Sequence, residues 1–187
     1  MDKKRKLVVI FPGVNYSIDK PFLYYCGLKY ASMRYDRIDI LYEVDKNKFQ
    51  AEDALNQVKA QVLEQAEKIP FEEYEEVVFV SKSFGTYVAG WLADTCSLKV
   101  KQLFLTPLPE TFPYIKGDDS VIATVIGVND YFTDAQALQE ICEKESSPAP
   151  ISRPVSCLGL VKFSQDRLSR VIIARFDNRI QIGPILR

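Results

Sequence analysis

The sequence predicts one α/β domain over residues 1–187, built on a doubly wound, mostly parallel sheet in three layers: helix, sheet and helix. Apolar runs of strand length alternate with segments of helical periodicity along most of the chain. Some runs, such as Leu7 to Phe11, are apolar at every position, as in strands buried on both faces. Alternation of this kind implies crossover connections between parallel strands. The 187 residues, with no visible repeat or linker, are enough for one domain with a sizeable core.

The first half of the chain contains two strand signals and two helix signals. In order, we expect a strand over 7–11, a helix over about 20–34, a strand over 38–42 and a helix over about 50–68. Asp19 is expected to cap the first of these helices, with Pro21 in its first turn. The helix over 50–68 carries apolar residues at helical spacing with charges between them, which is typical of one buried face.

The second half continues the alternation and then changes character. We expect strands over 77–80, 103–105 and 121–126, and helices over about 85–96 and 133–145. The segment from Ser146 to Pro150 breaks the last helix, and the periodicity after it is weak. Residues 146–187 are therefore an atypical tail of the domain.

Composition and charge exclude several classes of function. A net charge of −1 provides no field to attract nucleic acid or an anionic membrane, and no apolar stretch reaches the length of a membrane span. The four cysteines show no C-x-x-C pairing, which favours reduced thiols in a cytoplasmic protein. With no histidine and no glycine-rich phosphate loop, we expect neither a metal nor a cofactor. The oligomeric state is not predicted.

One segment, SKSFG at residues 81–85, carries the strongest chemical signal. It follows the apolar run 77–80 and precedes a helical pattern, so Ser83 lies at a strand-to-helix turn. Such a turn can hold a serine hydroxyl above the sheet if the flanking residues are small, as Ser81 and Gly85 are. The positive end of the following helix favours developing negative charge at that point. An ordinary turn in which Ser83 only caps the helix fits the same pattern.

Two further segments could complete a catalytic site around Ser83. FPGVNY follows the first strand, and an oxyanion hole would use the N–H group of Phe84 with one from Gly13, Val14 or Asn15. VIGVND places Asp130 just past a buried strand and later in the chain than the serine. Taken alone, the first segment is equally consistent with a plain turn, and Asp130 could cap the helix that follows.

Residues 7–145 resemble the α/β-hydrolase superfamily, and most closely its small, lidless serine hydrolases and esterases. The resemblance rests on VVIFPGVNYS, VVFVSKSFGT with its nucleophile elbow, and VIGVNDYF, each preceded by a strand and in this order. It implies Ser83 as nucleophile, Asp130 as the orienting acid, and hydrolysis of an ester or related acyl bond in a small-molecule substrate. It also implies a histidine after one more strand, in roughly residues 150–160, where this chain has none.

Two explanations of the missing histidine remain open: decay of the catalytic machinery, or a frameshift near Ser146. Read one base later, the codons for 147–160 permit LPLxFPGxxHxLD, which looks like the family's last strand and histidine loop. A tail in the wrong frame is expected to pack poorly. Lys82 adjoins Ser83, but consecutive side chains at such a turn are not expected to point together, so no base can be assigned. Without one, a serine hydroxyl is a poor nucleophile, and we expect impaired activity.

Aromatic residues after the strand ends suggest a partly apolar pocket, since ligands of such sheets bind there. They are Tyr16, Phe112, Tyr114, Tyr131 and Phe132. Packing of the loops alone would explain each of them equally well. Two readings compete with the hydrolase: a non-catalytic binding protein with the same fold, and another doubly wound fold, such as a flavodoxin-like one.

Overall fold

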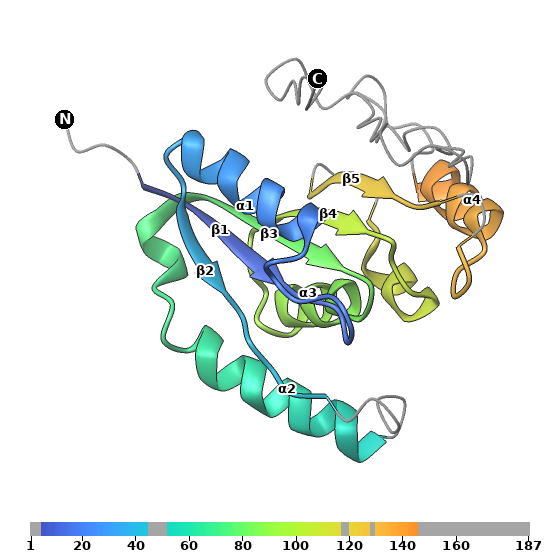
Figure 1. Ribbon diagram of the computed structural model, residues 1–187, viewed down its shortest axis with the longest axis horizontal. Helices are drawn as coiled ribbons and strands as arrows, with labels where there is room; N and C mark the ends of the chain where they lie inside the picture. Colours follow the sequence, from blue (N-terminus) through green and yellow to red (C-terminus); the bar gives the residue numbers. More distant parts are fainter. Residues whose placement is uncertain (1–4, 45–51, 117–119, 128–129, 146–187) are drawn as a thin grey trace.

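In the computed structural model, which describes residues 5–44, 52–116, 120–127 and 130–145, a parallel five-stranded sheet lies between helices (Figure 1). The strands are β1 (Arg5–Phe11), β2 (Asp36–Asp39), β3 (Tyr74–Lys82), β4 (Lys101–Leu105) and β5 (Val121–Val125), in the order β2-β1-β3-β4-β5. The helices are α1 (Pro21–Ser32), α2 (Glu52–Ala66), α3 (Phe84–Thr95) and α4 (Ala135–Glu145), with 3-10 turns η1 (Phe71–Glu73) and η2 (Pro109–Tyr114). The predicted fold class is confirmed.

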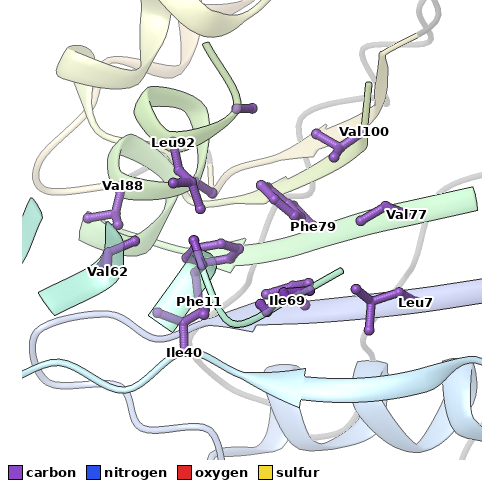
Figure 2. Close-up of a cluster of buried hydrophobic side chains, with 14 of the residues drawn as sticks. Leu7, Phe11, Ile40, Val62, Ile69, Val77, Phe79, Val88, Leu92 and Val100 are labelled. Atoms are coloured by element: carbon purple, nitrogen blue, oxygen red, sulfur yellow. The ribbon is translucent and has the colours of Figure 1, made fainter. Parts of the chain in front are cut away.

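Alternate residues of the central strands build two separate cores. Leu7, Val9 and Phe11 of β1 point to the face that α2 and α3 cover, where the rings of Phe11 and Phe79 lie 4.9 Å apart (Figure 2). Val8 and Ile10 point the other way and pack with Leu23 and Tyr30 of α1. Because both faces are covered, β1 has to be apolar throughout.

The second strand lies earlier than predicted, at Asp36–Asp39 instead of 38–42. Its register with β1 starts at the pair Leu7–Asp36, and the last ladder bond runs from the Ile40 N–H to the Ile10 carbonyl. Beyond this point Pro12 has no N–H to continue the ladder, and both backbone groups of Leu41 bind the side-chain amide of Gln65 in α2, at 3.0 and 2.6 Å. A side chain distant in sequence therefore holds the backbone just beyond this strand.

The predicted cap of α1 is also wrong. The residue before the helix is Lys20, which makes no side-chain cap, and Asp19 instead accepts a hydrogen bond from the Ser17 hydroxyl. The Phe22 N–H in the first turn donates to the Tyr16 hydroxyl at 3.0 Å. A tyrosine from the preceding loop thus takes the role expected of the aspartate, and Pro21 occupies the first turn as predicted.

The strand order reverses between β1 and β3. From β1 the chain moves to β2 on one side, and from β3 it moves to β4 and β5 on the other. In parallel sheets, the loops that leave such a point in opposite directions open a crevice at the carboxyl ends of the strands, where ligands bind. The loop after β1 and the turn after β3 border this crevice.

Other expectations concern the thiols, metals, the membrane and the tail. Cys26, Cys96 and Cys142 form no disulfide, whereas Cys157 lies outside the described residues, and the cytoplasmic location stays a prediction. Across the described ranges, no helix has the length and hydropathy to cross a membrane, and no cluster of three metal-ligating side chains occurs. The tail over 146–187, with its predicted frameshift, also lies outside the described residues.

We expect Gly85→Ala to lower the free energy of unfolding by about 2 kcal/mol, as overpacking does, although alanine favours helices. A Cβ at Gly85 would lie 2.4 Å from the Pro12 carbonyl oxygen and 2.6 Å from that of Phe11. Both are backbone atoms of the central strand and its loop, which cannot shift as the end of a side chain can. Gly27→Ala is the matched control, because its Cβ would meet the far end of a side chain, the guanidinium of Arg37, instead of backbone. Urea unfolding of both variants checks the prediction, and a Gly85→Ala protein as stable as the parent would contradict it.

Candidate active site

Ser83 is the single residue between β3 and α3, and its backbone is strained. Its φ of 53° and ψ of −123° belong to a region that residues with a side chain rarely adopt. The Ser83 N–H donates to the Leu105 carbonyl at 2.9 Å, and its own carbonyl accepts from the Thr86 N–H at 2.8 Å. Both sides of the turn are thus fixed. The Ser83 side chain makes no cap bond to α3, so the alternative of a merely capping serine is wrong.

The loop after β1 reaches Ser83. Gly13 and Tyr16 pair through their backbones, with the Gly13 N–H donating at 2.9 Å and the Tyr16 N–H at 3.2 Å. A Cβ at Gly13 would lie 3.3 Å from the Cβ of Ser83, so the two residues nearly touch. Within the described ranges, the N–H groups of Val14 and Asn15 have no acceptor. Of the three candidate donors in this loop, Gly13 is therefore already engaged, and Val14 and Asn15 remain.

A cavity of about 340 Å³ opens where these segments meet. It is lined by Gly13, Val14, Asn15, Tyr16, Lys82, Ser83, Phe84, Leu108, Pro109, Glu110 and Phe132. Its volume lies at the small end of the range for ligand sites and is enough for a small molecule. The structure thus brings Ser83, Phe84, the loop after β1 and two of the expected aromatic residues to one place.

Asp130 lies beyond the carboxyl end of β5, on the same edge of the sheet as Ser83. One of its carboxylate oxygens, Oδ1, accepts hydrogen bonds from the Phe132 N–H at 3.0 Å and the Thr133 N–H at 3.2 Å. It does not cap the following helix, because Asp134 does so by accepting from the Gln136 N–H at 2.9 Å. The Asp130 carboxylate is therefore held by the turn that follows it, independently of α4.

Lys82 lines the same cavity as Ser83, and the expectation that the two side chains diverge stays a prediction. Its Nζ atom donates to the Thr106 hydroxyl and lies 5.0 Å from the centre of the Tyr16 ring. Burial lowers the pKa of the Lys82 ammonium, and the negative charge of Asp130 partly opposes this. A half-buried cation is thus part of the site, next to the serine.

Three aromatic residues expected at the pocket lie elsewhere. Phe112 packs into a separate apolar cluster around Phe104, and Tyr131 is 92% exposed, with its ring against Phe132. Tyr114 lies over Gly90 on α3 and lines another cavity instead. The η2 turn carries Phe112 and Tyr114 away from the carboxyl ends of the strands.

Sequence analysis also missed residues that do line the cavity. Leu108, Pro109 and Glu110 follow β4 in the segment TPLPE, just after Thr106. The rule that places ligands at strand ends would have included them, since β4 neighbours β3. They were not predicted because none of the three is a residue type that by itself indicates a catalytic or binding role.

Comparison with known proteins agrees on the fold. No family model and no curated protein matches the chain. Among solved structures, it is similar to a protein of unknown function from Agrobacterium tumefaciens described as an α/β hydrolase, with a TM-score of 0.56 and 12% identity over 79% of this chain and 71% of that one. It is also similar to Est1E from Butyrivibrio proteoclasticus with bound ferulic acid, with a TM-score of 0.55 and 12% identity over 75% and 76% of the two chains.

An esterase from Pyrococcus furiosus is similar too, with a TM-score of 0.50 and 14% identity over 76% of this chain and 68% of that one. At these identities, the likeness shows the fold. Together with the parallel order β2-β1-β3-β4-β5, it establishes that this chain has the fold of α/β hydrolases.

We expect Ser83→Gly to raise the free energy of unfolding by about 1 kcal/mol, because glycine adopts the backbone angles of this turn without strain. Ser83→Ala is the matched control, since it removes the hydroxyl and keeps the strained φ of 53°. Chemical unfolding of the two variants measures the difference. A Ser83→Gly protein less stable than Ser83→Ala would show that the turn is unstrained.

Proposed function

We propose that this protein is a serine hydrolase of the α/β-hydrolase type that acts on an ester or related acyl bond of a small molecule, with Ser83 as the nucleophile. The observation that carries the proposal is the strained turn at Ser83, whose uncapped side chain borders a cavity at the point where the strand order reverses. Strain and unsatisfied polar groups gather at functional sites, because folding alone does not favour them. The solved structures named as hydrolase and esterase support the same class.

In the proposed reaction, the Ser83 hydroxyl attacks the carbonyl carbon of the substrate and an oxyanion forms. The Phe84 N–H at the start of α3 and one N–H from Val14 or Asn15 would stabilise that charge. The amino-terminal end of α3 adds its positive potential at the same point. Loss of a single donor from an oxyanion hole typically lowers the rate about 100-fold or more.

Asp130 is proposed as the acid that orients a base between itself and Ser83. Its Oδ1 atom is held by backbone N–H groups, which fixes the carboxylate at the same edge of the sheet as the serine. The base of such a triad is a histidine, and the sequence contains none. We therefore propose that the chain as given is an impaired hydrolase.

The missing histidine also favours a second candidate, a non-catalytic binding protein that retains the cavity of a hydrolase. This candidate predicts a site that holds a small acyl compound without activating Ser83. The two functions differ in the reactivity of one hydroxyl, which can be measured directly.

In a chain whose reading frame is restored after Glu145, a fluorophosphonate probe is expected to modify Ser83 covalently, because it reports an activated serine near oxyanion-stabilising groups. Ser83→Ala in that chain should abolish the modification, and the chain as given should label far more slowly. Ser81→Ala is the matched control, since the Ser81 hydroxyl is buried and donates to the Leu103 carbonyl. Intact-protein and peptide mass spectrometry locate the label. A restored chain that gains no label at Ser83 would favour the binding protein.

Hydrolysis of p-nitrophenyl acetate by the chain as given is expected to be slow, since a general base contributes about two to four orders of magnitude. A gene with the shifted frame restored after Glu145 should recover that rate, and Ser83→Ala in the restored chain should abolish the recovery. Asp130→Asn should lower the rate of hydrolysis only in the restored chain, where the carboxylate would orient a histidine. Release of p-nitrophenol is measured by absorbance. Rapid turnover by the unrestored chain would point to a base other than histidine.

A further inference from the structure

The charge of Lys82 has no carboxylate beside it. The ion pairs found among the described residues do not include Lys82, although its side chain is half-buried. Its polar contact is with the neutral hydroxyl of Thr106, and its other neighbour is the ring of Tyr16. Removing a cation from water is unfavourable unless another group compensates, and a hydroxyl and a ring compensate only in part.

Two of the three lysines that line the other cavity have a carboxylate partner. Lys116 pairs with Asp94 at 2.9 Å, and Lys101 lies 3.5 Å from Glu76, whereas Lys99, which is exposed, is in none of the ion pairs of the described residues. All three are more exposed than Lys82 and have less need of a partner. Lys82, the less exposed cation in the cavity that Ser83 lines, has no carboxylate partner in the described part of the chain.

Asp130 does not fill this role. It attracts Lys82, as the direction of the pKa effect shows, but the two groups are not among the ion pairs closer than 4.0 Å. Its Oδ1 atom is engaged by two backbone N–H groups. Within the described ranges, no carboxylate therefore lies within 4.0 Å of Lys82, and a ligand in the cavity that Lys82 lines would supply the opposite charge.

We propose that Lys82 is a specificity-determining residue that binds a carboxylate of the substrate, so that the site prefers acyl esters carrying one negative charge. This inference rests on the proposed function, because it names the substrate class of the same site. Lys82 and Ser83 line one cavity of about 340 Å³, so the carboxylate and the ester carbonyl would be separated by a short chain. Tyr16 and Phe132 offer apolar surface for that chain.

The number of charges favours a carboxylate over a phosphate. Lys82 contributes one positive charge to the lining, and Glu110 contributes a negative one. With both side chains charged, a bound monoanion leaves one negative charge in the cavity without compensation, whereas a dianionic phosphate leaves two, so the carboxylate is the less unfavourable ligand.

The test compares the binding of two small esters of equal chain length, anionic monomethyl adipate and neutral dimethyl adipate. Binding is measured by ligand-observed saturation-transfer NMR, with the parent protein and with Ser83→Ala, which excludes turnover. We expect the monoester to bind about tenfold more tightly than the diester, as a hydrogen-bonded charge pair in a partly buried site provides. Lys82→Gln and Lys82→Met should abolish this preference and leave the Kd for dimethyl adipate within about twofold of the parent.

Two control variants test whether the preference for the monoester depends on the positive charge at position 82. Lys82→Arg keeps the charge and should keep a preference for the monoester. Lys59→Gln is the matched control, because Lys59 is also a half-buried lysine over aromatic rings, 5.2 Å from Trp91, but lies outside the cavity. It should bind both esters as the parent does, and circular dichroism checks that each variant is folded.

Equal affinity of the parent protein for the two esters would overturn the inference, and so would a preference that survives in both Lys82→Gln and Lys82→Met. The test measures binding, so its result does not depend on whether Ser83 is catalytically active. A lost preference in these variants, together with a Ser83 that stays unlabelled in the frame-restored chain, would support the carboxylate site and reject the hydrolase. A labelled Ser83 in a protein with no preference between the two esters would support the hydrolase and reject the carboxylate site.

Discussion

The close approach of α3 to the carboxyl end of β1 is the constraint on which the rest of the site depends. At Gly85 the first turn of the helix lies so near the carbonyl oxygens of Phe11 and Pro12 that no side chain fits between them. This contact fixes where the helix starts, and hence where Ser83 must turn the chain. It also brings the loop after β1 against Ser83, as the distance from Gly13 shows. One glycine therefore sets the relative position of two segments about seventy residues apart in the chain.

The groups around the cavity satisfy one another less well than those in the rest of the protein. The Ser83 backbone is strained and its side chain makes no cap bond. Lys82 has no ion-pair partner within the described part of the chain. The Val14 and Asn15 N–H groups have no acceptor there either. By contrast, β1 and β3 are packed on both faces and paired along their length. The sheet supplies the stability that allows one of its edges to remain incompletely satisfied.

Much of this arrangement could be predicted from sequence, because periodicity and strand ends follow from local pattern. The alternation of strands and helices predicted the sheet, and the residues after the strands predicted that Ser83, Phe84 and the Gly13 loop belong together. The contacts just beyond β2 could not be predicted, since they involve an amide of α2 distant in sequence. The contacts of Lys82 with Thr106 and Tyr16 could not be predicted either, because these partners come from loops elsewhere in the chain. Tyr114 was misplaced for a related reason, as the η2 turn folds it back onto α3.

The bonds from α2 to the segment after β2 have a consequence for solubility. Among the described residues β2 is an outer strand of the sheet, and its free edge could template pairing with another chain. Just beyond it, Gln65 occupies both backbone groups of Leu41, whose side chain is 58% exposed, and Gln61 accepts from the Glu43 N–H at 3.0 Å. These two glutamines leave an incoming strand no continuous row of donors and acceptors to extend. The helix thus protects an apolar, exposed stretch of the sheet margin against edge-to-edge aggregation.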